Sequence, residues 1–364
     1  MNHRVKYIFF IILSLLWTAC SHDAEESIQP IDSVPGLPDG AVGFGAVTKS
    51  GAVYTEDDYL HNTFIDGESY LRIYNYTSNK PDFTDDADYK WYVYDERLSD
   101  LTGGQYNFRP LEGRGFMWKD VKLENSQYRF YAIVFPHYHK YRNAVFDDQS
   151  KKENFQASDI LMAFHSTTEF GKRISLKFWH VLAMLRVKVC VPKYDRSTNT
   201  GFEKGALYNI ALSDLYTSFT IEYTQTLPSG SAPPVTPQTG DTAPKADIKM
   251  FALYDTEKLS SGIEEETING RDCYVYSFAA ILPVQQIADN KILLRLNLKT
   301  VDGLNKSYRY NPVNHNISFE AGKITDLKLT FKEESNEAFL IKAEIKPWEQ
   351  AETDMSLEKE ETEA

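Results

Sequence analysis

The segment that decides the fold spans residues 159–191 and reads DILMAFHSTTEFGKRISLKFWHVLAMLRVKVCV. Apolar residues occupy every second position in two stretches, Ile174–Phe178 and Ala183–Val191, on either side of Trp179–His180. Alternation with a period of two puts one set of side chains on a buried face and the other in water, which is typical of β-strands. The two strands follow one another without a turn signal. We therefore interpret the segment as the chain leaving one β-sandwich and entering the next.

Length and composition favour an all-β protein with two domains. The 364 residues are enough for two ordinary domains that each bury a core. Aromatic residues make up 13% of the chain, with 23 Tyr and 21 Phe, and such residues suit the half-buried surfaces of sheets. Short strands punctuated by turns, with no sustained helical period, indicate sandwiches rather than an α/β fold. The net charge of −13 makes nucleic acid and anionic membrane surfaces poor partners.

The N-terminus predicts export. Arg4 and Lys6 precede a short apolar run over residues 8–16, and Thr18-Ala19 stand before Cys20. This is a signal segment, and its apolar run is too short for a stable membrane span. Small residues followed by Cys resemble a lipoprotein signal that is cut before Cys20, whose thiol then carries the lipid. An ordinary secretory signal is the alternative.

The expected organisation has five parts. Residues 1–19 are a signal peptide, and residues 20–40 are a flexible tether rich in acids, Pro and Gly. Two β-sandwich domains follow, over residues 41–180 and 181–348. Residues 349–364 form an acidic tail that we expect to be disordered.

Short apolar and aromatic runs place the individual strands. We expect the proline-rich stretch Thr224–Lys245 to be an exposed loop outside any ladder. The expected strands are Ala41–Ser50, Tyr70–Tyr76, Lys90–Tyr94, Phe116–Trp118, Tyr128–Phe135, Asp159–Ala163, Ile174–Phe178, Ala183–Val191, Ala206–Leu212, Phe219–Tyr223, Tyr274–Leu282, Ile292–Leu298, Tyr308–Tyr310, Ile317–Phe319, Leu327–Phe331 and Phe339–Lys346.

Several clusters were weighed as metal or ligand sites. His137 and His139 share one face of an extended chain, yet no third ligand can be identified, so solvated histidines are the better interpretation. The acids at positions 82, 85, 86 and 88 miss the calcium-loop spacing. His180 is expected to be a hydrogen-bonded residue at the junction. We therefore expect no metal and no cofactor.

The tryptophans and cysteines do not indicate a specific binding or catalytic site. Trp91 and Trp118 could stack on sugars, but aromatic residues in sandwiches mostly lie in the core or in cross-strand pairs. Cys190 falls on the polar face of its strand, so pairing with Cys273 and two lone thiols both stay open. The G-x-S-x-G motif of serine hydrolases is absent, and no two carboxylates stand out. The sequence favours a protein that is not an enzyme.

Three groups of motifs resemble the fimbrillin family, the lipoprotein-derived pilus subunits of anaerobic Gram-negative bacteria. The first runs from Asp159–Ala163 to Leu176–Ala183, and the second is the strand YRFYAIVFP from Tyr128. The third is the succession of Pro283, Asp302-Gly303, Phe319–Lys323 and Ile345–Trp348. The resemblance covers about residues 41–350, and it implies two tandem β-sandwich domains of the transthyretin or immunoglobulin type behind the signal and tether.

The resemblance also implies a function. Fimbrillins have a first strand followed by a Thr-Arg-Ala-like cleavage site, and this chain has Thr48-Lys49-Ser50 there. Lys49 is therefore the candidate processing site. The candidate exchanged strand is Ala41–Lys49, with Val42, Phe44 and Ala46 as its inward residues. Other fimbrial subunits would be the partners, in a homo- or heteropolymer built by β-strand donation.

The expected location is the surface of the outer membrane, in a fimbrium and anchored through the lipid on Cys20, with adhesion to a host or bacterial surface ligand. A different class of function is an outer-membrane glycan-binding lipoprotein of a polysaccharide-uptake system, which clustered aromatics on an exposed sheet face would favour. A secreted hydrolase is a third option. The sequence leaves open the shaft, tip or anchor role, the ligand, the cleavage at Lys49 and the identity of the donated strand.

Overall fold

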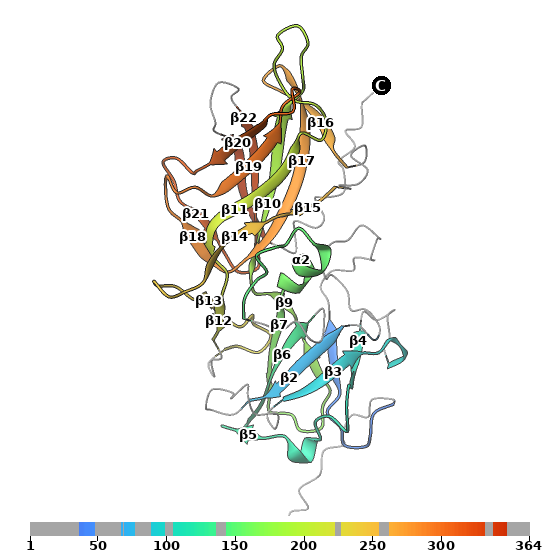
Figure 1. Cartoon of the computed structure of the whole chain (residues 1–364). Coiled ribbons are helices and arrows are strands. Elements are labelled where there is room, and N and C mark those ends of the chain that lie inside the picture. The colour runs from blue at the N-terminus through green and yellow to red at the C-terminus, as the bar shows by residue number, and fades with distance from the viewer. Residues whose placement is uncertain are drawn as a thin grey trace, which may run out of the picture.

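The structure is a computed structural model that describes residues 36–47, 67, 69–76, 89–98, 105–135, 143–222, 227–254, 262–331 and 338–347. These residues form mostly strands and one short α-helix, α2 (Lys152–Ser158), so the predicted all-β fold is confirmed. The strands fall into two groups along the chain, with α2 lying between them (Figure 1). Here the strands between residues 44 and 180 are called the N-terminal unit, and those between residues 183 and 347 the C-terminal unit.

The N-terminal unit is one hydrogen-bonded sheet in the order β8-β1-β4-β3-β2-β6-β7-β9, with β5 attached to β6. One face of this sheet encloses an aromatic core of its own, in which Phe108 and Phe130 are fully buried. The strands are β1 (Phe44–Val47), β2 (Tyr70–Asn75), β3 (Tyr89–Tyr94), β4 (Gln105–Pro110), β5 (Leu123–Glu124), β6 (Gln127–Phe135), β7 (Leu161–Thr167), β8 (Ile174–Leu176) and β9 (Trp179–His180).

The C-terminal unit is built around two sheets that face each other across a second core. The larger sheet has the order β15-β17-β10-β22-β23 with β16 beside β17, and the smaller has the order β14-β11-β19-β20. The larger sheet contains β10 (Ala183–Pro192), β15 (Phe251–Ala252), β16 (Glu264–Ile268), β17 (Arg271–Leu282), β22 (Lys323–Phe331) and β23 (Ala338–Pro347). The smaller contains β11 (Leu207–Tyr216), β14 (Lys245–Lys249), β19 (Leu294–Lys299) and β20 (Asn305–Tyr310). Two short ribbons pair β12 (Phe219–Ile221) with β13 (Val235–Pro237) and β18 (Gln285–Ile287) with β21 (Ile317–Phe319).

The junction between the units is itself buried. The second face of the N-terminal sheet contributes Tyr131 and Phe164 to a core that continues into the C-terminal unit. Phe155 of α2 stacks on Phe251 with ring centroids 4.9 Å apart. Gln149, fully buried, donates from Nε2 to Ile281 O and accepts from Ile281 N–H, both at 2.8 Å. The paired amide satisfies a strand backbone that would otherwise be buried without partners.

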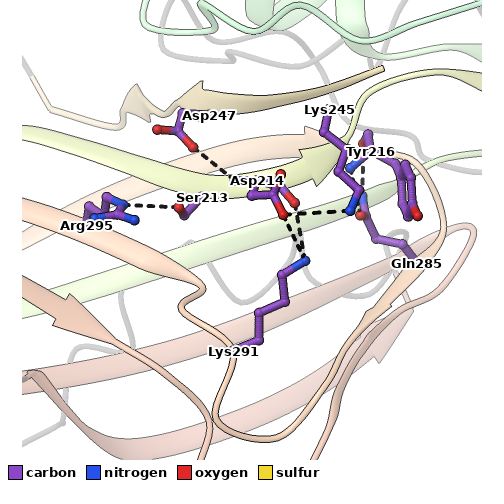
Figure 2. Close-up of polar contacts among 8 residues, drawn as sticks. All are labelled: Ser213, Asp214, Tyr216, Lys245, Asp247, Gln285, Lys291 and Arg295. Atoms are coloured by element: carbon purple, nitrogen blue, oxygen red, sulfur yellow. Dashed lines mark hydrogen bonds and ion pairs between the residues drawn. The ribbon is translucent and has the colours of Figure 1, made fainter. Parts of the chain in front are cut away.

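A bulge in β11 shapes the outer side of the smaller sheet (Figure 2). The register with β14 shifts between Leu212 and Leu215, and Asp214 takes a φ of 52°, in the left-handed region. Its carboxylate lies 3.3 Å from Lys291 Nζ and 3.7 Å from Lys245 Nζ. A bulge of this kind bends its strand and increases the local twist of the sheet.

Two sequence predictions fail near β4. Phe116–Trp118 is not a strand: Trp118–Asp120 form the 3-10 helix η3, and Met117 makes only an isolated bridge to Ala41. The strand that lies beside β3 is β4, which the sequence analysis missed. Its residues QYNFRP do alternate, with Tyr106 and Phe108 between polar residues, but the run is short and contains Asn and Pro, which are depleted in strands; Asn107 is nevertheless buried in the sheet.

The predicted exposed loop Thr224–Lys245 is also wrong in part. Within it, β13 pairs with β12 and buries Val235, and β14 begins at Lys245. Gly230 reaches the N-terminal unit, where its N–H donates to Phe164 O and its carbonyl accepts from Trp179 Nε1, both at 2.9 Å. Prolines leave room for such short pairings at sheet edges, where one N–H is not required.

Two expectations about burial are corrected as well. Cys190 lies on the other face of β10 from Val189 and Val191, as the alternation predicts, yet it is buried there in a small cluster with Cys273 and Val275; both thiols are free. The alternation within residues 339–346 puts Ile345 on the apolar face of its strand, yet 47% of it is exposed. Its partner across the ladder, Thr325, is buried, but β23 is the edge strand of the larger sheet, so one side of Ile345 is open to solvent.

Candidate functional site

The candidate site is β1 together with the groove that it fills. β1 runs antiparallel to β4, with Phe44 opposite Phe108 and Val47 opposite Gln105. On its other side it runs parallel to β8, with Phe44 opposite Ile174. The short first strand is therefore an interior strand of the sheet, and its removal would open two ladders at once.

The inward side chains of this segment fill the N-terminal core. Val42, Phe44 and Ala46 are each only 1% exposed. The Phe44 ring lies edge-on to the rings of Tyr92 at 5.0 Å and Phe130 at 5.2 Å. Burial of a Phe or Val side chain stabilises by about 1.5–3 kcal/mol, and edge-on aromatic pairs add about 0.5–1.5 kcal/mol each.

The outward side of β1 is covered by Arg173. A Cβ on Gly45 would approach the Arg173 guanidinium within 2.1 Å, so the arginine lies directly against the bare backbone of the strand. Desolvation in this position lowers the pKa of Arg173 from its ordinary value. A strand in this place is therefore selected by the apolar pockets inside, while outside the flexible end of Arg173 would have to move aside for a residue larger than Gly45.

Backbone contacts continue the attachment before β1 begins. Val42 N–H donates to Phe116 O at 2.9 Å, and Trp118 N–H donates to Gly40 O at 3.0 Å. Ile174 N–H donates to Gly43 O at 2.8 Å. The segment attached to the N-terminal sheet therefore extends from residue 40 to residue 47.

Polar contacts fix the strand that β1 pairs with. Asp95, at the end of β3, accepts from Arg97 Nη2 at 2.8 Å and lies 3.0 Å from Arg109 Nε of β4. The hydrogen bonds from Arg97, followed by the charges of both arginines, lower the pKa of Asp95. Beside Phe44, burial raises the pKa of Tyr92, whose neutral hydroxyl accepts from Phe116 N–H at 2.8 Å.

Some of the other residues that the sequence analysis singled out lie within the described part of the chain, and others lie outside it. Cys20, Lys49, His137, His139 and the acids at positions 82, 85, 86 and 88 lie outside the described residues. His180 is hydrogen-bonded as expected, with Nδ1 2.9 Å from Asp159 Oδ1, and Asp159 is 2% exposed. Within the described part of the chain, no three His, Cys, Asp or Glu side chains form a group that could hold a metal ion.

The two tryptophans that the sequence analysis singled out, both within the described residues, do not form an exposed aromatic platform. Trp118 is 2% exposed and packs against Tyr128. Trp91 is half-buried beneath the Arg72 guanidinium, which lies 5.6 Å from its ring. Among the residues that the structure describes, no helix combines the length and apolar character needed to cross a membrane.

Sequence reasoning missed the residues that line the groove. Arg173 gave no signal because its role depends on Gly45, more than a hundred residues earlier. Phe116 was placed on a strand, although it contributes its carbonyl and its ring to the seat of the first strand. A glycine between two inward residues of a predicted strand is the one sequence sign of a close contact on the outward side.

Comparison with solved structures gives distant similarities. A candidate cell adhesion protein from Bacteroides uniformis is 15% identical, with a TM-score of 0.49, over 85% of this chain and 100% of that chain. The tip fimbrial protein Mfa3 from Porphyromonas gingivalis is 10% identical, with a TM-score of 0.35, over 84% and 99%. A candidate polysaccharide binding protein from Bacteroides thetaiotaomicron is 8% identical, with a TM-score of 0.33, over 84% and 96%.

Among proteins with curated descriptions, none matches the chain. The fimbrillin-like family matches residues 61–348, which is most of the sequence and includes strands of both units. The chain therefore belongs to the fimbrillin-like family.

Proposed function

We propose that this protein is a structural or adhesive subunit of a cell-surface fimbrium that assembles with other subunits by β-strand donation. The membership in the fimbrillin-like family supports the fimbrial part of the proposal. In the proposed precursor, Cys20 carries the lipid anchor in the outer membrane, and cleavage after Lys49 releases the segment that contains β1. Residues 20–40, 41–180, 181–348 and 349–364 act as tether, two sandwich domains and tail.

The observation that carries the mechanism is the position of β1 between β4 and β8. Removal of this strand would free the backbone groups of Gln105–Phe108 on one side and Ile174–Leu176 on the other. It would also open the apolar pockets that Val42, Phe44 and Ala46 fill. An extended segment from a neighbouring subunit restores both, since ladder hydrogen bonds give affinity and side chains in alternate pockets give register.

The free energy of burial supports replacement of β1 by another strand rather than a groove that stays empty. Two of the inward side chains, Val42 and Phe44, are each worth about 1.5–3 kcal/mol of burial. An empty groove therefore costs a substantial part of the stability of an ordinary domain, which is about 5–15 kcal/mol. A cleaved subunit should accept almost any strand with the right pattern of side chains.

The test follows the first strand through processing. The full-length protein is treated with a lysine-specific protease, and N-terminal sequencing identifies the new terminus. The cleaved protein is then titrated with a fluorescent peptide of residues 38–50. We expect a start at Ser50, peptide binding, and SDS-resistant ladders when cleaved subunits are mixed.

A matched peptide with Phe44→Asp is the control. It should bind at least about 100-fold more weakly for two reasons. The apolar burial of the Phe44 ring is lost, and a charged carboxylate has to enter an apolar pocket. Equal binding of both peptides, or a protein that still starts only at Cys20 and stays monomeric after treatment with the protease, contradicts the strand-donation proposal.

A further inference from the structure

A cavity of about 370 Å³ opens in the N-terminal unit, beside the end of β2, the start of β3 and residues 114–122. Its lining includes Lys119 and Asp120 of η3 and Lys122, which precedes β5. β5 lies at the end of the N-terminal unit that is far from the C-terminal strands (Figure 1). The volume of the cavity is within the range of ligand sites, about 300–1,000 Å³. Residues 116–117 of its lining also contact the segment before β1.

The lining of this cavity is positively charged. Lys90, Arg114, Lys119 and Lys122 line it together with one carboxylate, Asp120, which gives a net charge of +3 in a chain with a net charge of −13. Within the described residues, no ion pair joins Lys90, Arg114 or Lys119 to a carboxylate. Cations that share a cavity repel one another, and an anion that enters it relieves this repulsion because it is attracted by all of them.

The wall of the cavity is fixed rather than a loose loop. Lys122 N–H donates to Asn75 Oδ1 at 2.6 Å, and Asn75 Nδ2 donates to the carbonyls of Lys122 and Arg129, both at 3.3 Å. Gly115 has a φ of +67°, and a Cβ there would come within 2.7 Å of Tyr92 Oη. The buried ring of Trp118 anchors the same segment. The backbone of the wall is therefore in place before a ligand arrives, and only the charged side chains have to be ordered on binding.

The mixed lining narrows the class of ligand. A bare anion would leave most of the volume unfilled and would be repelled by Asp120, whereas a hydroxylated molecule can donate to that carboxylate. Met117 adds apolar atoms of the kind that contact the carbon faces of a sugar ring. A nucleic acid needs a basic track along its backbone, and an extended peptide needs a sheet edge or groove. A compact cavity with several cations offers neither.

We propose that this cavity binds an acidic saccharide, with the carboxylate or sulfate of the sugar held by Arg114, Lys119 and Lys90 and a hydroxyl held by Asp120. Guanidinium and ammonium groups form charge-assisted hydrogen bonds to such anions, about twice as strong as neutral ones. The recognition is electrostatic and does not use an exposed aromatic platform. The inference goes beyond the subunit role and does not depend on strand exchange.

The test uses the full-length, uncleaved protein and isothermal titration. The probes are a glucuronic-acid-containing disaccharide, a sulfated disaccharide, the neutral disaccharide cellobiose and inorganic sulfate. We expect at least one acidic disaccharide to bind at least about 10-fold more tightly than cellobiose and sulfate, with affinity that falls as salt is added.

Two variants with the same loss of charge locate the site. The double variant Arg114→Gln/Lys119→Gln should lower the affinity for the acidic sugar at least about 10-fold, because both cations lose their charge. The control Lys299→Gln/Lys306→Gln removes two exposed cations from β19 and β20 and should bind like the unchanged protein. Thermal unfolding of both variants checks that each is folded.

Four outcomes overturn the proposal. They are binding of cellobiose as tight as that of the acidic sugars, binding of inorganic sulfate as tight as theirs, no binding of either acidic disaccharide, and equal loss of affinity in both double variants. Equally tight binding of cellobiose would show that the anionic group is not recognised, and equally tight binding of sulfate would show that the sugar is not recognised. Equal loss of affinity in both double variants would show that the affinity depends on the net charge of the protein. None of them bears on strand donation, which the peptide titration tests separately.

Discussion

The first strands of the two units have the same kinds of neighbours in their sheets but differ in how firmly they are held. β1 has an antiparallel neighbour, β4, and a parallel one, β8, and β10 likewise lies between antiparallel β17 and parallel β22. β1 is four residues long and pairs over four residues with β4 and three with β8. β10 is ten residues long and pairs over ten residues with β17 and seven with β22.

This difference separates a replaceable strand from a permanent one. β10 follows almost directly after β9, so a cut beside it would divide the chain between the units. β1 is the first strand of the described chain, and a cut after Val47 leaves every other strand connected. β1 and β10 can therefore have opposite roles although each lies between an antiparallel and a parallel strand. The number of paired residues and the place of the strand along the chain decide which of the two can leave its sheet.

The largest expected effect comes from breaking β10. Val187→Asp puts a carboxylate at a fully buried position in the centre of the C-terminal core. An unpaired buried charge costs several kcal/mol, so we expect a loss of about 4 kcal/mol or more and an unfolded C-terminal unit. Circular dichroism during thermal unfolding measures the loss. Val301→Asp, at a position 45% exposed, should change stability by less than about 0.5 kcal/mol. A folded Val187→Asp protein would contradict the permanent role of β10.

A smaller effect is expected from the outward face of β1. Gly45→Val forces a branched side chain against Arg173, and overpacking of this kind costs about 1–3 kcal/mol. The cost should be confined to the N-terminal unit, so hydrogen exchange should speed up in β1 and β4 and stay slow in β10. In an Arg173→Ala background the same substitution should be nearly neutral. An equal cost in both backgrounds would show that the arginine does not select the strand.

The smallest effect is a dependence on pH at the support of β4. Since its arginine partners hold the pKa of Asp95 below the ordinary value of 3.8, the ionised form is favoured in the folded state. This stabilisation is fully present above pH 3.8 and is lost as the pH falls through the lowered pKa. Arg97 is largely exposed, so the gain is about 1 kcal/mol or less.

The matched variant for this prediction is Asp95→Asn. It should be less stable than the unchanged protein at pH 6 and nearly equal to it at the acid limit, as thermal unfolding at both pH values would measure. A stability difference that does not change with pH would contradict the ionic role of Asp95.

Most of the architecture could be predicted from the sequence because strands leave a local pattern. Leu294, Leu296 and Leu298 alternate with Arg295 and Asn297, and the first three are fully buried. Asp302-Gly303 forms the expected tight turn, in which Gly303 has a φ of +80°. The inward set Val42, Phe44 and Ala46 could be named because their spacing alone puts them on one face.

The errors occur where a neighbour overrides the local pattern. Asn107 lies buried in β4, where its Nδ2 donates to Leu98 O, and Cys190 is buried because other residues of the sheet cover its polar-looking face. Ile345 is 47% exposed because β23 is the edge strand of its sheet. None of these neighbours is close in sequence, so no window of the sequence contains the cause.

The sequence by itself determined the all-β class, the change of sheet after His180 and the inward face of the first strand, because period-two alternation and turn residues act over a few neighbouring positions. The tertiary structure decided that β1 lies between β4 and β8, that Arg173 covers Gly45 and that four cations meet in one cavity. Those features join residues up to about 130 positions apart, and only the folded chain brings their side chains together.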